Sequence, residues 1–209
     1  MNKNFVKINQ DTWARKNTFI GFSHFEIPLL SIDFDLVIGD SFKFCKENKI
    51  PFFFFILFHL AKAANEVENF RYRISEEGEV LLYEKIHPDW VHAIGGDSDN
   101  IRPIYCEFKE EFREFITHAQ SEYTEVDFGS NEDYNYLFYA SCLPWLNFKS
   151  VKQAHYKKDE CIPKFIWGKV MDSKLPFSVQ AHHGLVDGYH ISLLKNKMEE
   201  NINEHIRSL

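Results

Sequence analysis

The apolar positions of this chain repeat with two periods, which predicts both helices and strands. Helical spacing marks residues 32–48, where Asp33 occupies the N-cap position. A second helix is expected to begin at Pro51 and to follow the apolar run that ends at Ala64. A mixed-charge stretch at 109–122 and the C-terminal stretch from Tyr189 to Met198 predict two further helices.

Alternating apolar residues predict the strands. Residues 70–74 and 80–84 are expected to pair as a hairpin, because Glu76-Glu77-Gly78 between them has turn chemistry. Residues 19–30 are expected to form a strand pair or a bent strand. Further strands are expected at 90–93, 134–141, 147–151, 165–170 and 176–182. Helices that alternate with strands predict an α/β (α+β) two-layer sandwich, in which a mixed β-sheet packs against helices.

Length and composition favour one domain over residues 1–209. The chain has no Pro/Gly/Ser-rich linker, no internal repeat and no low-complexity tract. Its 21 Phe suit a large apolar interface or a deep apolar pocket. The formal net charge of -7 argues against nucleic acid as a partner, since a duplex requires a basic face.

Neither a membrane nor a secreted location is expected. The first ten residues are too polar for a signal peptide. The longest apolar run, 51–64, contains His59 and Lys62 and is shorter than the roughly 20 residues that span a bilayer. The four cysteines share no pairing or metal spacing, so we expect reduced thiols, no metal and a cytoplasmic protein.

The candidate chemistry lies in residues 180–190. Two adjacent histidines, His182 and His183, precede Asp187 and Gly188 at the junction between a predicted strand and a predicted helix. An imidazole has an ordinary pKa near 6.5, so at neutral pH it can take a proton from a hydroxyl and return it. A lone His-x-x-x-Asp arises often by chance, but the paired histidines, the Asp-Gly and the strand-turn-helix context favour a catalytic site. Gly188 is expected to supply the backbone freedom of the turn.

Three segments of this chain resemble the chloramphenicol acetyltransferase family. The family signature is His-His, three small or apolar residues, Asp-Gly, an aromatic and His, and the chain matches it at His182, His183, Asp187, Gly188, Tyr189 and His190. Residues 141–148 are similar to the Ser-x-x-Pro-Trp segment of the family. Trp13 to Arg15, followed by Phe19, is similar to its Trp-x-Arg opening. The segments occur in the family's order along the whole chain.

The resemblance implies a direct transfer of acetyl from acetyl-CoA to an alcohol, without an acyl-enzyme. His183 would be the general base, and Ser141 would donate a hydrogen bond to the oxyanion of the intermediate. Asp187 would pair with Arg15 and so hold the loop of the imidazole, instead of acting as the third member of a triad. The structural alternatives are that His183 is a core histidine, that Ser141 satisfies a strand edge and that Arg15 is solvated.

The resemblance also implies the binding surfaces and the assembly. Trp145 and Phe148 would line the substrate channel, and Lys169 would lie near the phosphates of coenzyme A. A plain core role for the aromatics and a solvated position for Lys169 stay open. The family assembles as a homotrimer whose active sites lie at subunit interfaces, with the base from one chain and much of the acceptor pocket from the next. A zinc site at His182, His183 and His190 is disfavoured because no helix face would gather them.

The acceptor side departs from the family pattern. Phe22 aligns with a tyrosine that usually orients base or substrate, and Ile166 stands where a threonine normally holds a water. Residues 95–100 replace a threonine-rich segment, and Val170 replaces a common aromatic near the coenzyme. Chloramphenicol is therefore the first expected acceptor, and another hydroxylated small molecule is the alternative.

Two further readings concern relatives of this fold. Dihydrolipoyl acyltransferase cores have a similar His-x-x-x-Asp-Gly end, but their lipoyl and subunit-binding domains are absent from this sequence. A catalytically silent, ligand-binding trimer is the non-enzymatic alternative, and the presence of His183, Ser141, Asp187 and Arg15 argues against it.

Overall fold

The computed structural model describes residues 4–93, 99, 101–121, 124–125, 134–155 and 160–208. Residues 95–100, apart from Asp99, are outside this set. The elements in chain order are β1 (Phe5–Lys7), α1 (Lys16–Ser23), β2 (Leu29–Val37), α2 (Ser41–Glu47), α3 (Phe52–Glu66), the 3₁₀ helix η1 (Glu68–Arg71), β3 (Tyr72–Ile74), β4 (Val80–Tyr83), β5 (His87–Ala93), β6 (Ile101–Tyr105), α4 (Phe112–Ser121), β7 (Thr124–Glu125), β8 (Leu137–Cys142), β9 (Lys164–Trp167), β10 (Lys174–His182) and α5 (Gly188–Arg207).

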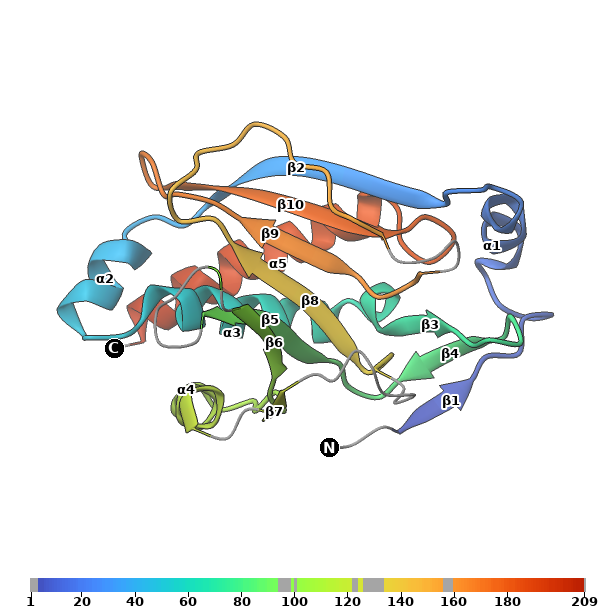
Figure 1. Ribbon diagram of the computed structural model, residues 1–209, viewed down its shortest axis with the longest axis horizontal. Helices are drawn as coiled ribbons and strands as arrows, with labels where there is room; N and C mark the ends of the chain where they lie inside the picture. The colour runs from blue at the N-terminus through green and yellow to red at the C-terminus, as the bar shows by residue number, and fades with distance from the viewer. Residues whose placement is uncertain are drawn as a thin grey trace.

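A seven-stranded mixed sheet organises the molecule (Figure 1). Its strand order is β2-β10-β9-β8-β5-β6-β7. The β5–β8 and β8–β9 pairs are parallel, and the other pairs are antiparallel. A smaller antiparallel sheet has the order β1-β4-β3, and its β3–β4 hairpin turns through Gly78 at a φ of 79°. The α/β prediction of a mixed sheet packed with helices is confirmed.

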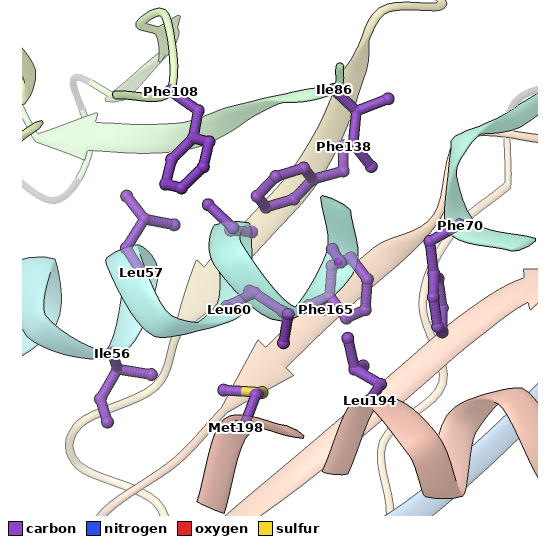
Figure 2. Packing of buried hydrophobic residues seen from close by; sticks show 14 of the residues in the cluster. Ile56, Leu57, Leu60, Phe70, Ile86, Phe108, Phe138, Phe165, Leu194 and Met198 are labelled. Carbon is purple, nitrogen blue, oxygen red and sulfur yellow. The ribbon is translucent and has the colours of Figure 1, made fainter. Parts of the chain in front are cut away.

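The helices α3 and α5 pack on one face of the large sheet. Leu60 of α3 and Leu194 of α5 lie near Phe165 of β9, Phe138 of β8 lies next to this group, and Leu57 lies further along α3 (Figure 2). All five side chains are fully buried. Burying one Leu or Phe side chain contributes about 1.5–3 kcal/mol, so this layer holds the strands in place.

Side chains that alternate along the strands divide between the two faces. Phe177 and Val179 of β10 point into the helix layer and are fully buried. Ser178 lies between them and points to the opposite face, which we call the outer face. The register places Ser178 beside Ile166 of β9, and Ile166 beside Ser141 of β8. The outer face therefore carries candidate site residues.

Two predictions about the N-terminal third were wrong. Residues 19–30 contain most of α1 and only the start of a strand. Residues 32–48 contain the end of β2 and the short α2, and Asp33 lies within the strand instead of at a helix cap. The cause is that Ile32, Phe34 and Leu36 alternate with two aspartates. Nine residue pairs join β2 to β10, and this pairing overrides the helical spacing.

Other elements were closer to expectation. The helices predicted at 109–122 and at 189–198 correspond to α4 and the longer α5, and Pro51 caps α3. The predicted hairpin is β3–β4. Residues 147–151 were expected to form a strand but belong to a loop. The sequence did not predict the strands β1, β6 and β7; of these, β1 and β7 are edge strands of three and two residues.

Candidate active site

His183 lies in a five-residue loop between β10 and α5. Its backbone N–H donates to the carbonyl of Pro28 at 2.7 Å. Its ring Nδ1 lies 3.2 Å from the carbonyl oxygen of Val186. A carbonyl only accepts, so this hydrogen bond requires the proton on Nδ1 and leaves the lone pair on Nε2. A half-buried imidazole in this tautomer can act as a base through Nε2.

Phe22 covers one face of the His183 ring. The two ring centroids are 3.9 Å apart and the ring planes differ by 22°. Phe22 also touches Phe25, with a centroid distance of 5.2 Å. The stack and the Nδ1 hydrogen bond together fix the plane and the rotation of the imidazole. Phe22 therefore contacts the His183 ring directly, although it has no hydroxyl to offer.

Arg15 and Asp187 form an ion pair that closes the histidine loop. Arg15 Nη1 donates to Asp187 Oδ2 at 2.9 Å. The same guanidinium donates to the carbonyls of His183 and Gly184, each at 3.3 Å. Burial raises the pKa of Asp187, but the hydrogen bond from Arg15, the electrostatic interactions with His190 and Arg15 and the hydrogen bond from the Tyr189 N–H outweigh it, so the pKa is lowered. Asp187 is thus ionised at neutral pH.

The neighbouring histidines have structural partners. His190 Nδ1 accepts from the backbone N–H of Asp187 at 3.1 Å, while Asp187 Oδ1 accepts from Tyr189 N–H at 3.0 Å. This capping box begins α5. His182 is buried, and its Nδ1 accepts from Gly184 N–H at 3.1 Å. In the part of the chain that the structure describes, no group of three or more metal-ligating side chains converges.

A second group of candidate residues surrounds the ends of β8 and β9. Ser141 is the penultimate residue of β8, and Ile166 is its neighbour in β9. Residues 143–155, which we call the strap, follow β8 and carry Trp145 and Phe148. Trp145 is 69% exposed, and Lys169 is also exposed. The backbone N–H of Lys169 donates to the carbonyl of Leu146 at 2.7 Å, which ties the strap to the end of β9.

Gly168 permits this close approach. A Cβ at residue 168 would collide with the carbonyl oxygen of Leu146 and would lie 3.1 Å from the Phe148 ring. Sequence reasoning did not single out Gly168, although a Gly-Lys pair directly after a strand was a usable signal. It also missed Asn69, whose side chain donates to the carbonyl of Leu185 in the histidine loop at 2.8 Å. Asn69 lies in η1 within a mostly polar stretch, which gave no such signal.

Ser141 lies near the end of β8 and His183 follows the end of β10, and these two strands run in opposite directions (Figure 1). Ser141, Ile166 and Ser178 share one row across β8, β9 and β10. His183 follows Ser178 by five residues along the chain, which corresponds to roughly 16 Å at about 3.3 Å per residue. One chain therefore does not bring Ser141 to His183. Arg15, Asp187 and Phe22 belong to the His183 group, whereas Trp145, Phe148, Ile166 and Lys169 belong to the Ser141 group.

Exposed apolar side chains accompany both groups. Ile20 and Phe25 are 45% and 55% exposed, and Ile27 lies beside them in sequence with similar exposure. At the other end, Trp145 and Leu146 are exposed on the strap. Apolar side chains gathered at a surface mark sites of association more often than isolated ones do. Each group therefore has a surface that a second molecule could cover.

A family model and a solved structure with the same mixed-sheet fold make the class an acyltransferase. The family model described as chloramphenicol acetyltransferase matches residues 1–199. The chain belongs to the chloramphenicol acetyltransferase family, as its sequence motifs predicted.

Individual proteins agree with this assignment. The chain is 26% identical to a chloramphenicol acetyltransferase of Clostridioides difficile, over 94% of this chain and 95% of that protein. It is 26% identical to one of Clostridium perfringens, over 95% and 99%. A solved chloramphenicol acetyltransferase structure is 27% identical, with a TM-score of 0.84 over 94% of this chain and all of that one.

A more distant structure shares the fold alone. The dihydrolipoamide acetyltransferase of Azotobacter vinelandii is 14% identical, with a TM-score of 0.62 over 91% of this chain and 88% of that one. Among the helices of the described ranges, none has the length and apolar character needed to cross a membrane.

Proposed function

We propose that this protein transfers the acetyl group of acetyl-CoA to a hydroxyl of chloramphenicol. The observation that carries the proposal is the His183 imidazole, whose Nδ1 proton is engaged by the carbonyl of Val186 and whose Nε2 therefore keeps a lone pair. The family membership and the names of the relatives support the acetyl donor and the acceptor. The four cysteines are free thiols, which suits the cytoplasm, where this donor is available.

The proposed reaction is a direct transfer. His183 Nε2 takes the proton of the acceptor hydroxyl as its oxygen attacks the thioester carbonyl carbon. The Ser141 hydroxyl donates a hydrogen bond to the oxyanion that forms. The carbon–sulfur bond then breaks, and the imidazolium returns its proton to the departing thiolate. Losing an oxyanion donor of this kind costs about 2.7–4 kcal/mol in the barrier.

The assembly follows from the separation of the two groups. We propose a homotrimer in which His183 of one copy faces Ser141 of the next. The roughly 16 Å between their positions within one chain supports this, because neither group can complete the site alone. A head-to-tail interface of this kind closes into a ring when the rotation allows it. The exposed apolar residues Ile20, Phe25 and Trp145 would be covered there.

The Ser141 group is the proposed binding surface for acetyl-CoA. Trp145 offers an exposed aromatic face, and Lys169 offers a cation next to the start of the strap. An aromatic ring stacks on a purine base, and an ammonium pairs with phosphate. Phe148 would line the route between this surface and Ser141.

Two side chains favour an acceptor other than chloramphenicol as the alternative. Phe22 and Ile166 offer no hydroxyl at the positions beside His183 and Ser141. An acceptor that needs no hydrogen bond from these positions, a hydroxylated small molecule other than chloramphenicol, is therefore the alternative. A silent ligand-binding trimer would require that His183 does no chemistry.

Steady-state assays of thiol release test the proposal. Acetyl-CoA is supplied with chloramphenicol and, separately, with a panel of other alcohols. Turnover of chloramphenicol that falls by several orders of magnitude in His183→Ala, but not in the exposed control His24→Ala, supports the proposal. If the protein turns over other alcohols but not chloramphenicol, the acceptor is the alternative, another hydroxylated small molecule. If His183→Ala keeps the normal rate on the best acceptor, His183 is not the base.

A further inference from the structure

The strap crosses the outer face of the sheet and is tied to it at both ends. Near its start, the Lys169 N–H donates to the carbonyl of Leu146. Near its end, the Gln153 amide donates to the carbonyl of Lys164 at 3.4 Å, and the Lys164 ammonium donates to the carbonyl of Ala154. These contacts anchor the end of the strap on β9 and its start on the segment that follows β9.

The middle of the strap has a different anchor. Ser150 Oγ donates to Asp33 Oδ2 on β2 at 2.9 Å. Among the described residues, this side-chain hydrogen bond is what joins residues 149–152 to the sheet. Asp33 pairs with Ser178 in the register, so it lies at the far end of the row that begins at Ser141. The strap thus leaves the sheet just after Ser141 and is fastened again at the other end of the same row.

The environment of Asp33 strengthens this anchor. Its second oxygen, Oδ1, is buried and has no hydrogen-bond partner among the described residues. A carboxylate that has lost part of its hydration forms a stronger hydrogen bond with the donor that remains. Asp35, two residues further along β2 and on the same face, is an exposed carboxylate.

We propose that Asp33 is a positioning residue for the acyl donor. Through Ser150 it holds the middle of the strap against the sheet, and Phe148, two residues earlier, is thereby kept at the route to Ser141. The inference rests on the proposed use of acetyl-CoA. It adds that β2, which contains none of the residues assigned to chemistry, controls the donor side of the site.

Enzyme kinetics give the first test. Asp33→Ala should raise the KM for acetyl-CoA about fivefold, the effect of one hydrogen bond, and should leave kcat within about twofold. Ser150→Ala should give the same change, and the double variant should be no worse than either single one. Asp33→Asn, which keeps an acceptor oxygen, should restore most of the affinity, and Asp35→Ala should have no effect. A general loss of kcat in Asp33→Ala, or an equal effect of Asp35→Ala, overturns the proposal.

Hydrogen exchange gives a readout that needs no activity. Peptides from 147–153 should exchange about fivefold faster in Asp33→Ala than in the wild type, while peptides from α5 stay unchanged. Unchanged exchange in the strap overturns the anchor. If exchange accelerates but the wild type neither binds nor uses acetyl-CoA, the proposed function fails, and the assignment of Asp33 to the donor fails with it, while the anchor stands. Faster exchange throughout Asp33→Ala means general destabilisation and also overturns the proposal.

Discussion

Replacing Arg15 by alanine removes the contact that holds the histidine loop. The guanidinium donates to Asp187 and to the carbonyls of His183 and Gly184, and its side chain is only 15% exposed. Breaking a fully buried ion pair commonly costs about 3–5 kcal/mol. Asp187 is 34% exposed, so water will screen the carboxylate that is left behind. We therefore expect a loss of about 2 kcal/mol in the free energy of unfolding.

Thermal melting at fixed protein concentration measures this loss. For a chain of this length, about 2 kcal/mol lowers the Tm by roughly 4–8 °C. The matched control is Lys16→Ala, because Lys16 is the next residue and pairs with the exposed Asp11. That variant should melt within about 1 °C of the wild type. The kcat of Arg15→Ala should also fall, since the imidazole loses its support.

The pH dependence of the Arg15→Ala effect follows from the lowered pKa of Asp187. A carboxyl whose pKa is lowered by folding contributes stability above its unfolded pKa, about 3.9. That contribution is lost as the pH falls through the lower folded value. The difference in Tm should therefore be full at pH 7 and should shrink below about pH 4. An Arg15→Ala variant that melts and turns over like the wild type at pH 7 would refute the reasoning.

Three further predictions concern other parts of the molecule. Gly168→Ala should displace the strap, because the new Cβ meets the carbonyl of Leu146, and should raise the KM for acetyl-CoA in steady-state assays. Burial, above all, lowers the pKa of His59 to about 3, so the free energy of unfolding should fall as the pH drops from about 6.5 towards 3. In pH-dependent unfolding, His59→Phe should remove that part of the slope. Phe22→Ala should free the His183 ring and lower kcat more than it changes the KM for the donor. A wild-type profile in any of these variants contradicts the corresponding argument.

The family was easier to predict from the sequence than the N-terminal elements were. The residues of the His183 loop are contiguous, so their motif was visible without any knowledge of the fold. The pairing of Arg15 with Asp187, which lies 172 residues away, was predicted only through the family resemblance. Helix and strand could not be told apart in residues 32–48, since β2 is decided by its nine partners on β10.

The sequence did not predict the backbone conformation and hydrogen bonds of the site. Gly188 was expected to provide turn freedom, but its φ is not positive, and the turn is closed by the capping box of Asp187 and His190. The carbonyls of Pro28 and Val186 position His183. Because every residue has a backbone carbonyl, the sequence does not indicate which ones will bind the histidine. The separation of Ser141 from His183 depends on strand register, which the alternation of residues does not specify over three strands.

The most direct test of the account mixes two inactive variants. His183→Ala and Ser141→Ala subunits are unfolded together in equal amounts and refolded, and thiol release is measured per subunit. If each site takes His183 from one copy and Ser141 from another, random assembly restores about one quarter of the wild-type activity. If both residues serve the same site within one chain, the mixture stays as inactive as the separate variants. That second result would contradict the account.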